Sequence, residues 1–95
     1  MRYLLDTCIM LYMLNKTGEM NNDVESIVFD YGNRLYICAA SVRELVAAWH
    51  KYQHTDTTDH LIIAHAITEH LPLISSDGKF DFYCNQGLDF IFNKK

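Results

Sequence analysis

The sequence predicts an α/β domain with a mainly parallel sheet, and three observations support this. Short apolar runs that suit buried strands alternate with segments that carry apolar residues at helical spacing. No proline-, glycine- or serine-rich linker, repeat or low-complexity tract divides the 95 residues. A hydrophobic fraction of 49% is ample for a packed core. We therefore expect one domain, residues 1–95, with helices on both faces of the sheet.

The first third of the chain predicts a strand and two helices. Residues 3–5 form an apolar run that suits a buried strand. Residues 7–14 are apolar nearly all round, so this helix must be covered on more than one side. Asn22 or Asp23 is expected to cap a second helix, which carries apolar residues as far as Tyr31 and ends at the following Gly-Asn pair.

The middle of the chain predicts a second strand and two further helices. Residues 34–39 are rich in β-forming side chains, and Ser41 is expected to open the next helix. A polar stretch over residues 52–58 predicts a loop, and Asp59 begins a helix that runs to His70. The expected inward-facing residues of the two helices are Val42, Leu45, Val46 and Trp49, then Ile62, Ile63, Ala66 and Ile67.

The last quarter predicts two strands. Pro72 forces an exit from the preceding helix, and residues 73–75 form a third strand. Asp77 and the glycine after it are a turn signal. Residues 79–83 suit one helical turn, and residues 88–92 suit a closing edge strand.

Four acidic residues are placed where these elements meet. Asp6 and Asp77 come at or just past the ends of predicted parallel strands, the edge at which open α/β sheets bind ligands. Glu44 and Asp59 fall in the first turns of helices that start from the same edge. Carboxylates brought together repel one another, and a divalent cation that prefers oxygen ligands, Mg²⁺ or Mn²⁺, resolves the repulsion. The pattern favours metal-assisted phosphodiester hydrolysis.

Each acid also has a local structural explanation. Ser41 and Glu44 have the spacing of a capping box. Asp6 can cap the first helix, and Asp59 can complement the dipole of its own helix. Asp77 and the glycine after it form an ordinary turn pair. The joint placement of the four acids at one edge is what favours the metal site.

Five motifs in this order resemble the PIN-domain family, and specifically its small VapC-type toxins. They lie at residues 4–7, 40–44, 54–66, 73–77 and 80–83. The resemblance implies a three-layer fold with a short, mainly parallel four-stranded sheet in the order 2-1-3-4, flanked by helices. It also implies a Mg²⁺- or Mn²⁺-dependent endoribonuclease, usually dimeric, that hydrolyses RNA and is silenced by the antitoxin of a type II toxin–antitoxin pair.

Carried over position by position, the resemblance assigns roles to individual residues. The metal-binding and catalytic acids are Asp6, Glu44, Asp59 and Asp77. The supporting hydroxyl positions are Thr7, Ser41 and Ser75. Lys79 and Arg43 are candidates to meet substrate phosphate, with solvated surface charge as the competing interpretation.

One departure from the family leaves a second function open. Typical members insert a helical segment between the second and third acids, where this chain has only residues 45–58. A shortened domain of this kind can serve as a binding or assembly module that is catalytically weakened or inactive. Retention of all four acids favours the enzyme, and the shortening favours the module.

Charge, hydropathy and cysteine content limit the kinds of protein that this chain can be. A net charge of −4 argues against a basic surface that coats nucleic acid. No apolar run approaches the roughly 20 residues of a membrane span, and Asp6 would interrupt a secretory signal, so we expect a cytoplasmic protein.

Cys8, Cys38 and Cys84 are expected to be small buried apolar residues. The apolar helix that begins at Cys8 suits dimer packing, antitoxin docking or plain burial.

Overall fold

The computed structural model describes residues 1–15, 18–43 and 56–94, and in this part of the chain four short strands form one sheet. The strands are β1 (Arg2–Leu5), β2 (Arg34–Ile37), β3 (Leu73–Ser75) and β4 (Phe90–Phe92). Their order is β2-β1-β3-β4, and each neighbouring pair is parallel. The predicted order 2-1-3-4 is confirmed. The sheet, expected to be mainly parallel, is parallel throughout the described chain.

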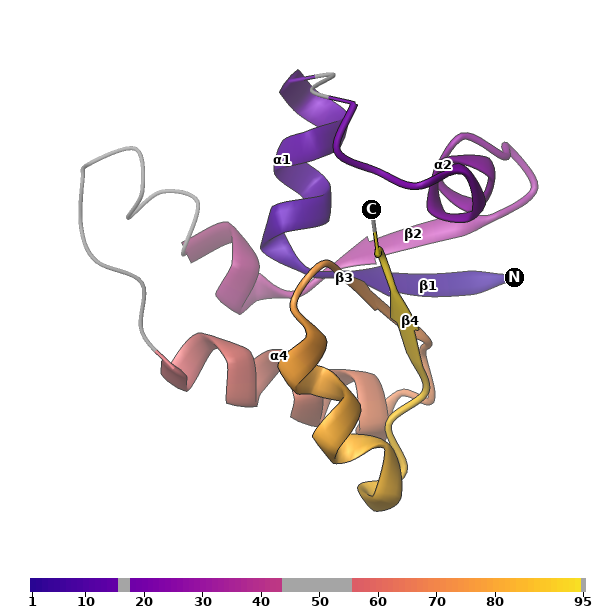
Figure 1. Ribbon diagram of the computed structural model, residues 1–95. Coiled ribbons are helices and arrows are strands. Elements are labelled where there is room, and N and C mark those ends of the chain that lie inside the picture. The colour runs from indigo at the N-terminus through magenta and orange to yellow at the C-terminus, as the bar shows by residue number, and fades with distance from the viewer. Residues whose placement is uncertain (16–17, 44–55, 95) are drawn as a thin grey trace.

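Helices cover both faces of this sheet (Figure 1). Helices α1 (Thr7–Asn15) and α2 (Asn22–Val28) lie on one face. Helix α4 (Asp56–Thr68) and the 3₁₀-helix η1 (Gly78–Gln86) lie on the other. The described chain therefore forms three layers, helix on sheet on helix, as an α/β architecture requires when both faces of a parallel sheet are buried.

Two hydrophobic clusters, one on each face of the sheet, hold the layers together. Successive side chains of β1 point to opposite faces, so that Tyr3 and Leu5 belong to one cluster and Leu4 to the other. The buried residues of the α1–α2 side are Tyr3, Leu5, Ile9, Val24, Val28 and Ile74. Those of the α4–η1 side are Leu4, Cys38, Ala40, Ile62, Ile63, Ala66, Leu71, Leu73, Phe80 and Leu88.

The pairing of β1 with β3 fixes the geometry of the sheet edge. Leu5 lies opposite Ile74, and the backbone amide of Asp6 donates to the Ile74 carbonyl at 3.0 Å. The chain therefore leaves both strands side by side. Residue 6 and residues 75–77 emerge at the same carboxyl edge, where ligands bind in open parallel sheets.

Helix α2 begins one or two residues earlier than expected and also ends earlier. The N-cap is Asn21, whose side chain accepts a hydrogen bond from the Val24 amide at 2.8 Å. Neither Asn22 nor Asp23 is the cap, because both already lie inside the helix. The helix ends at Val28, and Tyr31 is fully exposed in the turn that follows.

The helix expected to open at Ser41 starts at residue 39. The Cys38 carbonyl accepts from the amides of Ser41 and Val42, at 2.9 and 3.3 Å, so Ser41 lies inside the first turn. The capping-box interpretation of Ser41 is therefore wrong, and Val42, expected to face inward, is 50% exposed. The other expected inward residues of this helix, Leu45, Val46 and Trp49, lie outside the described residues.

Helix α4 starts at Asp56, three residues before the expected start at Asp59, and it ends at Thr68. Its predicted inward face is confirmed. Ile62, Ile63 and Ala66 are buried, and Ile67 packs against the same cluster.

After β3, the structure is more helical than expected. Asp77 is the N-cap of η1, which extends for nine residues instead of one turn. The 3₁₀-helix ends at Gln86 and is capped by Gly87, whose φ of 98° is a left-handed conformation that suits glycine. The last strand is shorter than predicted and begins at Phe90.

Helix α1 exposes little of its apolar surface in the described structure. Ile9 and Met10 are buried, Cys8, Leu11, Tyr12 and Met13 are partly buried, and Leu14 is 67% exposed. The expectation that this helix is covered on more than one side stays a prediction. Among the described residues, no helix has the length and hydropathy needed to cross a membrane.

Two phenylalanines of η1 provide a matched test of this packing. Phe80 is fully buried and its ring lies 5.9 Å from that of Phe90, whereas Phe82 is 74% exposed. Replacing Phe80 with alanine is expected to lower the free energy of unfolding by about 3–5 kcal/mol, because the change leaves a cavity in the core. Replacing Phe82 with alanine should cost less than about 1 kcal/mol. Urea denaturation of both variants checks this, and equal losses would contradict the packing described.

Candidate functional site

Asp6 is a buried carboxylate at the carboxyl end of β1. The residue is 7% exposed, and its carbonyl accepts from the amides of Ile9 and Met10, so that it occupies the N-cap position of α1. Its Oδ1 accepts a hydrogen bond from the Thr7 amide at 2.8 Å. The side chain bonds the first amide of α1, not the second or third that a capping side chain usually bonds, and it leaves Oδ2 for other partners.

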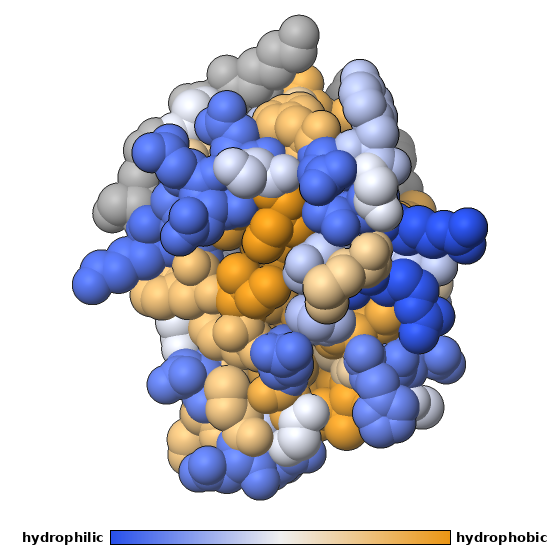
Figure 2. Space-filling model, turned by 90° about the vertical axis from the view of Figure 1, so that its right-hand side faces the viewer, coloured by the Kyte–Doolittle hydropathy of each residue, from blue (hydrophilic) through white to orange (hydrophobic). Residues whose placement is uncertain are grey.

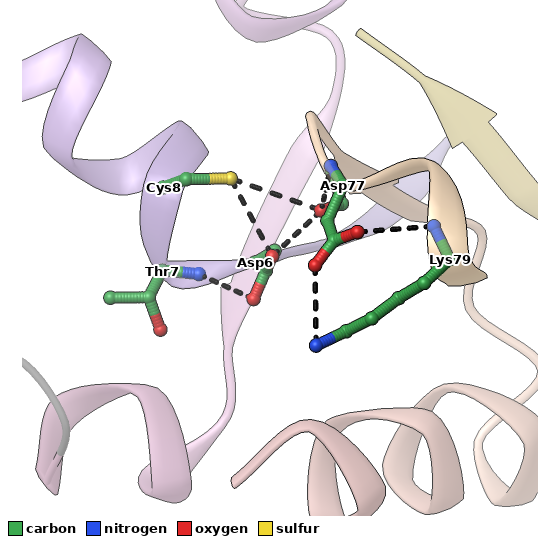
Figure 3. A network of polar contacts seen from close by, with 6 residues as sticks. Asp6, Thr7, Cys8, Asp77 and Lys79 are labelled. Carbon is green, nitrogen blue, oxygen red and sulfur yellow. Dashed lines mark hydrogen bonds and ion pairs between the residues drawn. The ribbon is translucent and has the colours of Figure 1, made fainter. Parts of the chain in front are cut away.

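Ser75 joins Asp6 to the turn that carries Asp77. Its hydroxyl donates to Asp6 Oδ2 at 2.7 Å and accepts from the Asp77 amide at 3.0 Å. Ser75 is fully buried at the end of β3. One side chain therefore fixes two predicted acids relative to each other, and the resulting network is drawn in Figure 3.

Asp77 presents its carboxylate at the surface of the same network (Figure 3). As N-cap of η1 it accepts from the Lys79 amide at 3.1 Å, and its Oδ2 lies 3.2 Å from Lys79 Nζ. Both side chains are about half exposed. An exposed pair of this kind contributes at most about 1 kcal/mol to stability. Lys79, predicted as a phosphate contact, lies next to the acids.

Cys8 adds a thiol to the network. Its Sγ lies 3.5 Å from Asp6 Oδ2 and 3.8 Å from Ser75 Oγ. Burial raises the pKa of this thiol, and the Asp6 carboxylate raises it further. The expectation that all three cysteines are buried is wrong, because Cys8 is only partly buried and Cys84 is exposed; Cys38 alone meets it.

Two of the predicted supporting hydroxyls are buried without a hydrogen-bond partner. These are Thr7 Oγ1, next to Asp6, and Ser41 Oγ. A buried hydroxyl left unpaired costs about 1–3 kcal/mol. The third supporting residue, Ser75, has the two hydrogen bonds described above.

The structure describes only part of the predicted four-acid set. Asp6 and Asp77 are brought together through Ser75. Asp59 lies in the first turn of α4, but its side chain is outside the described part, as is all of Glu44. Across residues 1–15, 18–43 and 56–94, no group of three His, Cys, Asp or Glu residues could hold a metal ion. The predicted phosphate contact Arg43 is exposed on the helix that starts at residue 39.

The described carboxylates are donors of the type that Mg²⁺ and Mn²⁺ prefer. Asp6 and Asp77 offer hard carboxylate oxygens, although the two residues do not by themselves form a metal site. Asp6 and Asp77 are the described residues that would hold such an ion.

Asn93 is a residue that the sequence reasoning missed. It follows β4 directly and is 3% exposed, with its side-chain amide bonded to Ser76 Oγ at 2.7 Å. The signal that pointed to Asp6 and Asp77, a polar residue just past a parallel strand, applies to Asn93 equally. Cys8 had no comparable signal, because its contact with Asp6 depends on the direction of α1.

Comparison with known proteins found no similar protein. No family model, no curated protein and no solved structure matches this chain.

The contact between Cys8 and Asp6 predicts a change in thiol reactivity. In an Asp6→Asn variant the pKa of Cys8 should fall, because the nearby negative charge is gone. A larger thiolate fraction at pH 8 should then speed alkylation of Cys8 by iodoacetamide. Peptide mass spectrometry measures the rate at each cysteine, with the exposed Cys84 as the internal control. An unchanged rate at Cys8 would contradict the contact.

Proposed function

We propose that the chain is a metal-dependent endoribonuclease, the toxin of a type II toxin–antitoxin pair, with the VapC-like architecture that its motifs resemble. The observation that carries the proposal is the bridge made by Ser75. This buried hydroxyl links Asp6 and the Asp77 turn at the carboxyl edge of a parallel sheet. An edge of this kind is where open α/β folds bind ligands.

In this proposal the four acids Asp6, Glu44, Asp59 and Asp77 hold Mg²⁺ or Mn²⁺. When bound, the ion supplies positive charge that stabilises the negative charge developing on phosphate and leaving oxygen, and it acidifies the attacking water. Asp6 contributes oxygens held in a fixed orientation, because the Thr7 amide and the Ser75 hydroxyl bind both of them. A fixed orientation avoids reorganisation when substrate binds.

Lys79 and Arg43 are the proposed contacts to substrate phosphate. Lys79 Nζ lies 3.2 Å from Asp77 Oδ2, which places an ammonium beside the proposed metal site. Arg43 is exposed, so it is accessible to an anion. Its planar guanidinium can bind two phosphate oxygens at once.

The proposed protein partners, an antitoxin or a second copy of the chain, would bind an apolar surface. Figure 2 shows one face of the molecule on which apolar side chains gather in the centre, with hydrophilic ones around them. An apolar groove also lies between α1 and α2. It is lined by Tyr12, Met13, Gly18, Met20, Glu25 and Phe29. Surfaces of this kind support pairing with an antitoxin or a second copy of the chain in the cytoplasm.

The same groove supports the second candidate, a catalytically weakened binding or assembly module. Phe29 is 58% exposed at the groove and Leu14 is 67% exposed near the end of α1. A module would use this surface without needing the acids. The two candidates differ in whether the acids at the sheet edge affect RNA.

Cleavage of structured RNAs tests the enzyme directly. The protein with Mn²⁺ is expected to cut, and EDTA should abolish cutting. Asp6→Asn should lower the rate at least about 100-fold, because it removes a charged metal ligand. Asp23→Asn is the matched control, since Asp23 is an exposed acid in the first turn of α2.

The possible results separate the two candidates. Metal-dependent cutting that survives Asp6→Asn would show that the acids are not the site. Absence of cutting, together with no shift of the melting temperature on adding Mn²⁺, would favour the binding module.

A further inference from the structure

Asn93 occupies a buried position where three segments meet. Its Oδ1 accepts from the Asn21 amide at 2.6 Å, and its Nδ2 donates to the Glu19 carbonyl at 2.9 Å and to Ser76 Oγ at 2.7 Å. Its backbone amide donates to the Ser75 carbonyl at 2.7 Å. The side chain thus joins the end of β4 to the segment before α2 and to the turn after β3.

The contact with Ser76 lies inside the turn that joins the two acids. Ser76 stands between Ser75, which bonds Asp6, and Asp77, whose amide donates to Ser75. A bond at the middle residue of this turn limits how far Asp77 can move relative to Asp6. A residue at 3% exposure whose amide is fully used has little freedom to release that bond.

We propose that Asn93 is a positioning residue for the candidate site, acting through Ser76 on the turn that carries Asp77. The link to catalysis depends on the proposed nuclease function, whereas the positioning itself does not. Asn93 touches neither acid. It sets the place of Asp77 through a hydrogen bond to the preceding residue.

Replacing Asn93 removes three side-chain hydrogen bonds and risks unfolding, so the sharper test is at Ser76. Ser76→Ala removes only the hydroxyl that meets Asn93, and Ser76→Thr keeps it. Ser26→Ala is the matched control, the same chemical change at an exposed serine of α2.

The first measurement is amide hydrogen exchange at Asp77 by NMR, with no metal present. Ser76→Ala should speed exchange about tenfold, the factor that corresponds to loss of roughly one hydrogen bond. Ser76→Thr and Ser26→Ala should leave the rate near that of the wild type. An unchanged rate in Ser76→Ala, or equal acceleration in the control, would overturn the proposal.

The second measurement is Mn²⁺ binding by titration calorimetry. The dissociation constant is expected to rise about tenfold in Ser76→Ala and to return in Ser76→Thr, as for other groups that orient metal ligands. An unchanged constant in Ser76→Ala would overturn the link between positioning and the metal site. If the wild type neither binds Mn²⁺ nor cuts RNA, the proposed function fails, and the exchange rates alone decide the positioning role.

Discussion

The parallel pairing of β1 with β3 is the constraint on which the candidate site depends. With Leu5 opposite Ile74, the next residue of each strand, Asp6 and Ser75, comes to the same edge within hydrogen-bond distance. A shift of one residue in this register would turn Ser75 to the other face of the sheet. The clusters on the two faces prevent that shift, because Leu4 and Leu5 are buried in different layers. Core packing therefore sets the position of the polar edge.

The two described acids occupy contrasting environments. Burying Asp6 is costly unless its charge is compensated, and the Thr7 amide and the Ser75 hydroxyl provide two hydrogen bonds to it. Asp77 is exposed and its partner is the flexible side chain of Lys79. One acid is thus held by two hydrogen bonds in the interior, while the other is bonded at the surface.

Apolar runs in the sequence were sufficient to find the strands and the edge at which Asp6 and Asp77 lie, whereas the strand order was implied by the resemblance. Apolar runs identify strands because both faces of a parallel sheet are buried, and the ends of those strands locate Asp6 and Asp77. Helix starts were less predictable, since several adjacent residues before α2 can all act as caps and tertiary contacts select Asn21. The bonds from Ser75 and Asn93 were beyond reach. The partners Asp6, Glu19 and Asn21 lie 69 to 74 positions away in the chain, and even Ser76 lies 17 positions from Asn93.

The buried hydroxyl groups near this edge of the sheet are also difficult to explain by the stability of the fold alone. The starts of α1 and of the helix at residue 39 each contain a buried hydroxyl without a partner, at Thr7 and Ser41. Alanine at either position would avoid the cost of an unpaired hydroxyl. Capping explains Asp6 and Asp77, but it does not explain these two residues. The proposed site, which uses oxygen donors, would give these two hydroxyls a role that the stability of the fold does not.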